Sequence, residues 1–213
     1  MKWTLSALER LRMMEDVFDR AAVERLNGFT RKEASVYLTR WRRAGLVQSA
    51  GFRSGIYYNL SRHEEPDGEM RLRALQMAYP TAVLMGESVL HAAGWTTQIP
   101  QRMSVAVLNR RSYFEIDGVD VHPRPKRWFR RVHPHLVGPR EADFSTYGLD
   151  ALPPALALAD TLADRIGWHP DVDDLDPGEI EENAGAVTEA FELLGAEMPG
   201  EIAELVDGVP SPG

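Results

Sequence analysis

The residues best suited to binding chemistry are basic, and they gather in one segment near the N-terminus. The stretch "RKEASVYLTRWRRAGLVQSAGFR", from Arg31 to Arg53, holds six Lys and Arg against one Glu. Such a density of cations is typical of a surface that binds the phosphates of nucleic acid. The residues that we expect to contact duplex DNA are Arg31, Lys32, Ser35, Thr39, Arg42, Arg43 and Arg53.

Charge is divided unequally along the chain. The formal net charge is -8, yet residues 1–60 carry 11 Lys and Arg against 6 Asp and Glu, and residues 61–140 carry 12 against 8. Residues 141–213 carry 1 against 18. The front of the chain therefore suits a polyanionic partner, whereas the acidic end suits a solvated surface, a basic partner or repulsion of nucleic acid.

Three histidines in the middle of the chain have types and spacing that could suit a metal ion. His133 and His135 alternate as they would on one face of a strand, and His122 lies upstream. Neither an HExxH pattern nor a carboxylate at a fixed spacing supports such a site. We therefore expect no metal ligands here.

Three carboxylates could instead serve a Mg²⁺-dependent nuclease of the restriction-enzyme type, since Glu115, Asp117 and Asp120 lie together in "FEIDGVDVH". Such nucleases usually carry an acidic residue and a lysine one position apart on the next strand. Here "VHPRPKRW" offers Lys126 without an acidic partner. The Asp117-Gly118 pair is typical of a tight turn, so the sequence favours a structural turn over a catalytic site.

Other signatures of catalysis and of export are missing from the sequence. We find no Gly-rich phosphate loop, G-x-S-x-G elbow or kinase signature, and we expect neither enzymatic activity nor a cofactor. There is no Cys, which excludes disulfides and thiolate metal sites. No run approaches the ~20 apolar residues that span a bilayer. We expect a soluble, cytoplasmic protein without membrane contact.

The elements that must position the basic residues are three helices and a hairpin within the first 60 residues. "LSALERLRMM" and "DRAAVERLNG" have the spacing of short amphipathic helices, the second ending at Gly28. Thr30 and Glu33 have the spacing of a capping box, which predicts a third helix from about Thr30 to Gly45. "LVQSAGFRSGIYYNL" then alternates apolar and polar residues around two glycines, as a hairpin does.

The third helix has one apolar and one polar face. Its apolar stripe consists of Ala34, Leu38 and Trp41, and the opposite face holds Lys32, Thr39 and Arg43. Three helices followed by a two-stranded hairpin is the order of a winged helix-turn-helix, whose recognition helix enters the major groove. The alternative is a solvated amphipathic helix. We place this domain at residues 1–66, because "SRHEEPDGE" has the composition of a linker.

Residues 67–213 are predicted to form an α+β domain with a helical, acidic C-terminal part. "MRLRALQMAY" and "TAVLMGESVLHAAG" favour helices, whereas "RMSVAVL", "SYFEI" and "VDVHP" favour strands. "RWFRRVHPHLV" could be a further strand, and helices return from "ALPPALALADTL" onward. Further contacts with nucleic acid or a partner could come from Arg124, Lys126, Arg127, Arg130 and Arg131.

The combination of this N-terminal pattern, "YPTAVLMGESVLHAAGWTTQIPQRMSVAV", a basic strand pair and "ALPPALALADTL" resembles the AbiEi-type antitoxins. These belong to type IV toxin–antitoxin systems, a form of abortive infection, and the resemblance covers about residues 15 to 185. It implies a bacterial cytoplasmic protein whose winged helix represses its own promoter. It also implies a C-terminal domain that counteracts a nucleotidyltransferase-type toxin. Dimerisation on DNA and direct contact with the toxin stay open.

Two alternatives to an antitoxin follow from the same residues. A stand-alone winged-helix transcriptional regulator would need the N-terminal segment alone, and a metal-dependent nuclease would need the carboxylates around Asp117.

Overall fold

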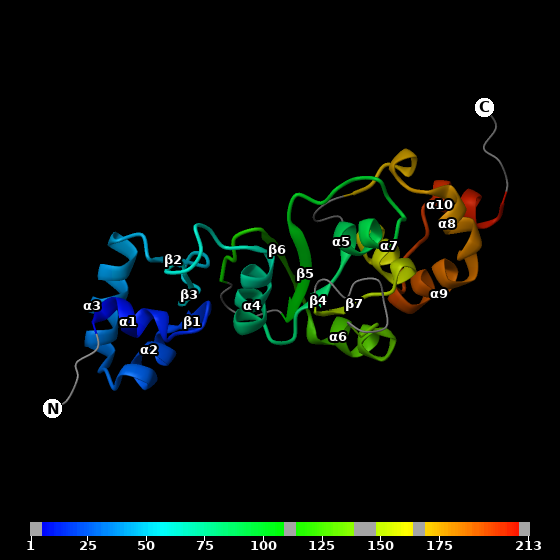
Figure 1. The fold of residues 1–213 in the computed structure, drawn as a ribbon. Coiled ribbons are helices and arrows are strands. Elements are labelled where there is room, and N and C mark those ends of the chain that lie inside the picture. The colour runs from blue at the N-terminus through cyan, green and yellow to red at the C-terminus, as the bar shows by residue number, and fades with distance from the viewer. Residues whose placement is uncertain (1–5, 109–113, 139–147, 164–168, 209–213) are drawn as a thin grey trace. The chain divides into compact units, whose positions relative to one another are not determined.

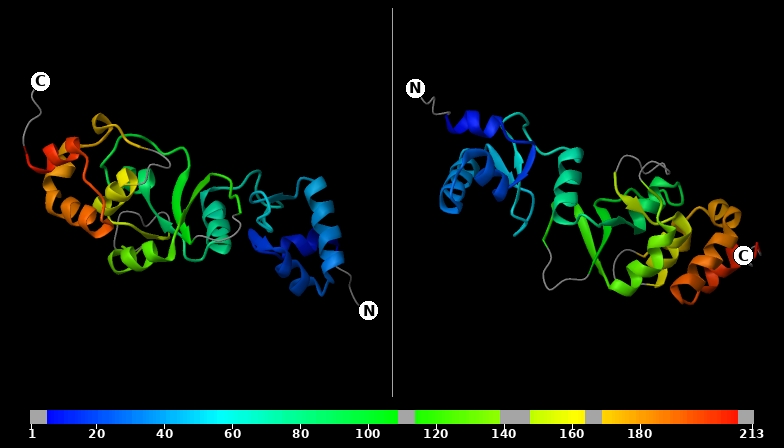
Figure 2. Two further views of the ribbon diagram at one scale, coloured as in Figure 1. Left: turned by 180° about the vertical axis from the view of Figure 1, so that it is seen from behind. Right: turned by 90° about the horizontal axis from the view of Figure 1, so that it is seen from below.

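The computed structural model describes residues 6–108, 114–138, 148–163 and 169–208 of the chain. The fold is mixed α+β, and it divides into two compact units (Figures 1 and 2). Unit 1 comprises Met1–Pro80 and Arg111–Val119, and unit 2 comprises Thr81–Arg110 and Asp120–Gly213. These bounds differ from the predicted domains, because the boundary follows Pro80 and a later segment returns to unit 1.

Unit 1 combines four helices with a small antiparallel sheet in the order β1-β3-β2. The three predicted N-terminal helices and the hairpin are present, with Val47 opposite Asn59 in the hairpin. The first strand was not predicted, because three residues are too short to show a period. In chain order the elements are α1 (Ala7–Arg12), β1 (Val17–Asp19), α2 (Arg20–Asn27), α3 (Arg31–Arg43), β2 (Val47–Ser49), β3 (Ile56–Asn59) and α4 (Gly68–Ala78).

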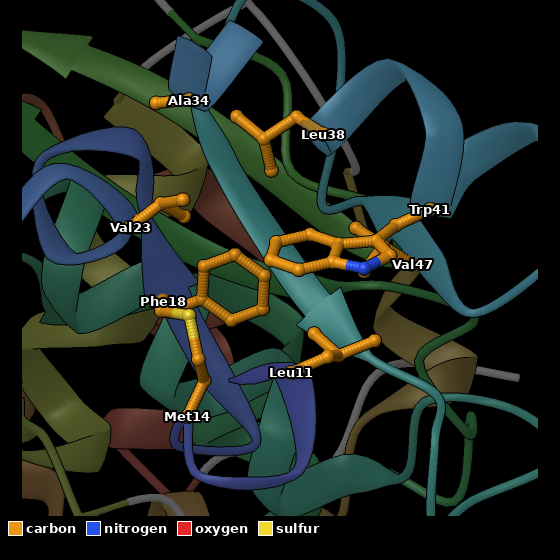
Figure 3. Packing of buried hydrophobic residues seen from close by; sticks show 8 residues of the cluster. All are labelled: Leu11, Met14, Phe18, Val23, Ala34, Leu38, Trp41 and Val47. Carbon is orange, nitrogen blue, oxygen red and sulfur yellow. The ribbon is translucent and has the colours of Figure 1, made fainter. Parts of the chain in front are cut away.

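The core of unit 1 forms around the indole of Trp41, which is 2% exposed. Figure 3 shows this ring directed at the Phe18 ring, with Leu38 and Val47 beside it. Its Nε1 donates a hydrogen bond of 3.2 Å to the carbonyl of Ala7, which ties α1 to α3. The predicted apolar stripe of α3 is thus the face that packs against α1, α2 and the sheet.

A buried amide on β3 holds the end of α1 in place. Asn59 is fully buried, and its Nδ2 donates to the carbonyl of Leu11 at 3.0 Å and lies 3.4 Å from those of Met14 and Glu15. Its Oδ1 accepts from the backbone N–H and the hydroxyl of Ser61. A buried amide whose donor and acceptor are both hydrogen-bonded fixes the relative position of the segments that it joins in an otherwise apolar core.

Unit 2 contains a four-stranded sheet in the order β6-β5-β4-β7, in which β4 is antiparallel to β5 and parallel to β7. The central helix α7 (Pro154–Ala163) is buried over most of its length and packs against α5 and α9. The other elements are β4 (Val83–Leu84), α5 (Gly86–Ala92), β5 (Met103–Leu108), β6 (Val119–Arg124), α6 (Lys126–Val132), β7 (Asp150–Ala151), α8 (Pro177–Glu182), α9 (Ala184–Leu194) and α10 (Gly200–Val206), with 3₁₀ turns at His133–His135 and Val172–Asp174.

The prediction of one helix over "TAVLMGESVLHAAG" is wrong in its first half. Val83 and Leu84 form a strand paired on both sides, and the helix begins only at Gly86. Gly86 has a φ of 57°, a left-handed conformation that breaks the chain direction between strand and helix. An apolar run that is buried on all sides does not distinguish a strand from a helix by its period.

The prediction of a strand over "RWFRRVHPHLV" is also wrong, because this segment forms α6 and a 3₁₀ turn. Trp128 and Val132, four residues apart, are buried, and the arginines between them are exposed. His133 and His135 are therefore exposed in a helical turn and do not alternate on a strand face.

The predicted strand "SYFEI" lies partly outside the described residues, and Phe114–Ile116 is not a strand. The Asp117-Gly118 turn is present, with the N–H of Val119 bonded to the carbonyl of Ile116 at 3.1 Å.

None of the helices in the described ranges has both the length and the apolar character that a membrane crossing requires.

We predict that Asn59→Ala lowers the free energy of unfolding by about 1–3 kcal/mol, because it leaves buried carbonyls without a donor. Asn59→Asp keeps the shape but turns the donor into an acceptor, and it should cost more. Urea denaturation measures both. Gln48→Ala, which removes an exposed amide from the neighbouring strand, is the control and should change stability by less than about 0.5 kcal/mol. Equal stability of Asn59→Ala and Gln48→Ala would contradict the role given to Asn59.

Candidate nucleic-acid interface

The exposed face of α3 carries the predicted basic residues. Lys32, Val36, Thr39 and Arg43 follow one another at helical spacing, and all of them are exposed. This row lies opposite the buried stripe, and Ser35 lies beside it. Arg31 and Arg42 are also exposed, at the edges of the row. The packing of α3 thus turns every predicted α3 residue outward.

The cations of this face are not neutralised by neighbouring carboxylates. Within the described residues, no ion pair involves Arg31, Lys32, Arg42 or Arg43. In the same unit, by contrast, Arg20 pairs with Glu24 at 3.4 Å. Unpaired cations in a row along a helix create a positive potential that attracts a polyanion.

The start of α3 is fixed by the predicted capping box. Thr30 Oγ1 accepts from the Glu33 N–H at 3.3 Å, and the Thr30 N–H donates to the Glu33 carboxylate at 2.8 Å. The backbone hydrogen bond from Thr30, followed by the one from its hydroxyl, lowers the pKa of Glu33. The single acidic residue of the helix is therefore engaged in its N-terminal cap.

The two hydroxyls of this face are already bonded within the helix. Ser35 donates to the carbonyl of Arg31 at 2.9 Å, and Thr39 donates to the carbonyl of Ser35 at 2.8 Å. Their oxygens keep free lone pairs and face outward as acceptors. On a DNA surface they would accept from base amino groups, whereas the arginines would donate to phosphates or guanine.

Val36 is a residue of this face that the sequence analysis missed. Its side chain is 41% exposed, among the hydrophobic residues of the described chain that stay open to solvent. It lies one turn after Lys32 and one turn before Arg40, inside the basic row. An aliphatic group at such a position is suited to contact a thymine methyl. The signal in the sequence is its place opposite Leu38 and Trp41 on the helical period.

The loop between β2 and β3 presents an aromatic ring and a guanidinium together. Arg53 lies over the Phe52 ring at 4.9 Å, and Phe52 is 62% exposed. Arg53 has a φ of 56°, an uncommon conformation for a residue with a side chain. Ser49 and Ser54 both donate to the carbonyl of Gly51, which holds this turn. These contacts give the loop a defined conformation, with Arg53 at its tip.

A segment distant in sequence braces this loop. The Asp117 N–H donates to the carbonyl of Ala50 at 3.0 Å. The Glu115 N–H lies 3.4 Å from the carbonyl oxygen of Phe52. Between these bonds the backbones approach so closely that a Cβ on Gly51 would lie 1.7 Å from the Glu115 carbonyl oxygen. Only glycine fits at that position, because the obstacle is backbone.

The structure brings Arg31 of α3 and Arg53 of the loop to the same groove. This groove has a volume of about 550 Å³ and is also lined by Arg20 at the start of α2. Arg31 and Arg53 therefore border one groove together with Arg20, whose charge is paired with Glu24, and Asp19 also lines it. The arrangement joins the helix and the loop into one basic surface of unit 1.

The second group of predicted basic residues is divided by the structure. Arg124 is not a surface contact: its side chain is 11% exposed and pairs with Asp160 at 2.8 Å. Trp128 Nε1 donates to the other oxygen of Asp160 at 2.6 Å. The remaining members are exposed on α6 rather than on strands, and they are Lys126, Arg127, Arg130 and Arg131.

The three carboxylates considered for Mg²⁺ do not form a metal-binding cluster among the described residues. Asp120 pairs with Arg102 at 2.6 Å in unit 2, whereas Glu115 and Asp117 belong to unit 1. Burial, and then the charge of Asp117, raise the pKa of Tyr58 to about 12. In the described ranges no three His, Cys, Asp or Glu side chains come together in a way that could hold a metal ion.

No family model and no curated protein matches the chain. Among solved structures it is similar to the crystal structure of the RV2827C protein from Mycobacterium tuberculosis, with a TM-score of 0.61. The sequence identity is 18%, and the match covers 95% of this chain and 73% of that chain. At this identity the likeness concerns the fold alone.

We predict that Gly51→Ala lowers the stability of unit 1 by about 1–3 kcal/mol, because the Cβ must displace the backbone at Glu115. Gly68→Ala is the matched control, since a Cβ there meets nothing within 4 Å and the residue starts a helix. It should be neutral or stabilising by up to about 1 kcal/mol. Urea denaturation compares the two, and equal stabilities would show that the loop does not need the brace.

Proposed function

We propose that unit 1 is a winged helix-turn-helix that binds duplex DNA. In this proposal α3 lies in the major groove, and the β2–β3 loop is the wing that places Arg53 on phosphate. The order of helices and strands in unit 1 and the sheet order β1-β3-β2 support it. The observation that carries it is the set of exposed cations on α3, opposite a fully packed stripe, which form no ion pair in the part of the chain that the structure describes.

The roles of individual residues follow from their chemistry. Lys32 and Arg42 are placed to meet phosphates, because Lys32 begins the row and Arg42 lies at its edge. Arg43 and Arg31 could use their planar donors on phosphate or guanine. Ser35, Thr39 and Val36 offer acceptors and a methyl surface for base edges. Sorting them requires the salt dependence of binding, since phosphate contacts release counterions and base contacts do not.

For the whole chain we propose a DNA-binding antitoxin of a type IV toxin–antitoxin system. It would repress its own promoter in the cytoplasm of a bacterium and counteract a nucleotidyltransferase-type toxin. This rests on the AbiEi-type resemblance of the sequence and on the size of unit 2, which exceeds what a DNA-binding module needs. The acidic end of the chain and the basic face of α6 give unit 2 two surfaces of opposite charge for a partner.

We predict that Arg43→Ala and Arg53→Ala each weaken binding to the protein's own promoter. Each should also flatten the plot of log affinity against log salt by about one unit, because one phosphate contact contributes a slope of about -0.9. Fluorescence anisotropy at several salt concentrations measures both quantities. Arg12→Ala removes an exposed arginine from α1 and is the control.

The outcomes separate the possible roles of these arginines. A loss of affinity for the promoter alone, with the slope unchanged, would make the residue a base reader. Affinity and slope equal to those of the unmodified protein for both variants would mean that α3 and the wing do not face DNA.

We predict that antitoxicity does not require DNA binding. The toxin encoded in the neighbouring gene would be co-expressed with the full chain, both from promoters that this protein does not control. The unmodified chain and the double variant Arg43→Ala, Arg53→Ala should both restore growth. Full-length variants are the right tools, because a cut after residue 66 would remove α4 and the returning segment from unit 1.

Failure of the double variant alone would contradict this prediction, because promoter repression cannot act in this experiment, and it would show that Arg43 and Arg53 are needed for antitoxicity itself. Failure of the unmodified chain would leave a stand-alone transcriptional regulator.

A further inference from the structure

Unit 2 contains a pocket of about 540 Å³ that no part of the proposed DNA interface uses. Its walls come from the end of β6, from α6, from α7 and from the last residue of α9. The described residues that line it include Pro123, Pro125, Arg127, Trp128, Arg131 and Leu194. This volume lies within the range of about 300–1,000 Å³ that small-molecule sites occupy.

The floor of the pocket is formed by a buried ion pair whose opposite charges balance. Asp160 is 4% exposed, and its two oxygens accept from Arg124 at 2.8 Å and from Trp128 Nε1 at 2.6 Å. Both carboxylate oxygens thus have donors, and its charge is balanced by the adjacent guanidinium. The pair fixes α7 against β6 and α6. An anion entering the pocket would therefore not meet an unbalanced carboxylate.

The mouth of the pocket carries two further guanidiniums on one face of α6. Arg127 and Arg131 are four residues apart, both are exposed, and both line the pocket. Neither forms an ion pair with any residue in the described ranges. Arg131 Nη1 donates to the carbonyl of Leu194, which anchors this side chain at the end of α9. One donor is used in this way, and the guanidinium keeps four others.

The lining of this pocket is more basic than the C-terminal part of the chain, which contributes α7 and α9 to it. The last 73 residues of the chain carry 18 acidic residues, yet Asp160 is the acidic residue among the described lining of this pocket. Glu189 and Glu192 of α9 line a different hollow, beside His135 and Pro153. The lining of this pocket therefore holds two arginines that form no ion pair among the described residues. Planar guanidiniums bind phosphate with paired hydrogen bonds, and the prolines, Trp128 and Leu194 supply apolar walls.

We propose that this pocket binds a nucleotide through its phosphate. Arg127 and Arg131 hold the phosphate at the mouth, and the apolar walls receive the sugar and base. The Arg124–Asp160 pair and Trp128 are positioning residues that keep the pocket open and its floor neutral. The site lies within unit 2, so this inference goes beyond the proposed DNA binding and does not depend on it.

The test is isothermal titration calorimetry on the full chain with adenosine 5′-monophosphate, with no DNA present. Adenosine monophosphate should bind, and adenosine should bind at least about tenfold more weakly, because it lacks the group that the arginines recognise. Arg127→Ala and Arg131→Ala should each weaken the nucleotide about tenfold or more. Arg12→Ala, the same change on α1 in unit 1, should leave the affinity unchanged.

Two sources could supply this nucleotide, and a competition experiment separates them. A 5′-phosphorylated RNA oligonucleotide that displaces adenosine monophosphate, when the 5′-hydroxyl form does not, would identify an RNA end as the ligand. Without displacement by either RNA, the ligand is a free nucleotide. Both results are consistent with a phosphate site.

The proposal is overturned by equal affinities for adenosine monophosphate and adenosine. It is also overturned if both arginine variants, folded by circular dichroism, bind the nucleotide as the unmodified chain does. Since no DNA is present, either result leaves the promoter experiments untouched.

Discussion

The rotation of one helix about its own axis determines the surface that unit 1 presents. The burial of Ala34, Leu38 and Trp41 sets this rotation, and the Trp41 Nε1 hydrogen bond to Ala7 adds a directional constraint. Removing a buried tryptophan or phenylalanine from a core costs about 3–5 kcal/mol. The exposed cations gain far less from any internal contact, because they form no ion pairs among the described residues. Packing therefore decides the orientation, and the basic row follows from it.

The loop between β2 and β3 depends on a different constraint, the close approach of two backbones. Gly51 lies against the carbonyl of Glu115, and hydrogen bonds on either side fix their register. This arrangement tolerates a left-handed Arg53, whose conformation costs energy that the surrounding bonds must offset. The chain reaches this contact only after it has passed through β5 of the other unit. The shape of the loop is thus a property of the folded chain and not of the hairpin alone.

Unit 2 buries a charged pair, whereas unit 1 keeps the cations of α3 exposed. Its Arg124–Asp160 pair is buried, and a buried pair stabilises only when the remaining polar atoms are bonded as well. Trp128 provides such a bond to Asp160. The consequence is that one member of a basic cluster, adjacent in sequence to the others, becomes internal. Its neighbours on α6 stay at the surface, where their charges are available to a ligand.

The sequence by itself determined the features whose causes are local. The capping box at Thr30 and Glu33, the end of α2 at Gly28 and the two faces of α3 depend on residues a few positions apart, and all are present. The α+β class was also predicted, since α3 shows a helical period and the short apolar run of β5 favours a strand. The basic composition of residues 31–53 identified a candidate interface before any contact was known.

Only the tertiary structure decided the features that depend on distant partners. Val83 and Leu84 became a strand because β5 and β7 lie on either side of them, and an apolar run carries no sign of such neighbours. The burial of Arg124 required Asp160, which is 36 positions away. The return of residues 114–119 to unit 1 depended on the glycine at position 51, whose missing side chain is visible in the sequence. The Glu115 backbone that occupies this space cannot be read from the sequence, because a local pattern reports a residue's own conformation and not what packs against it.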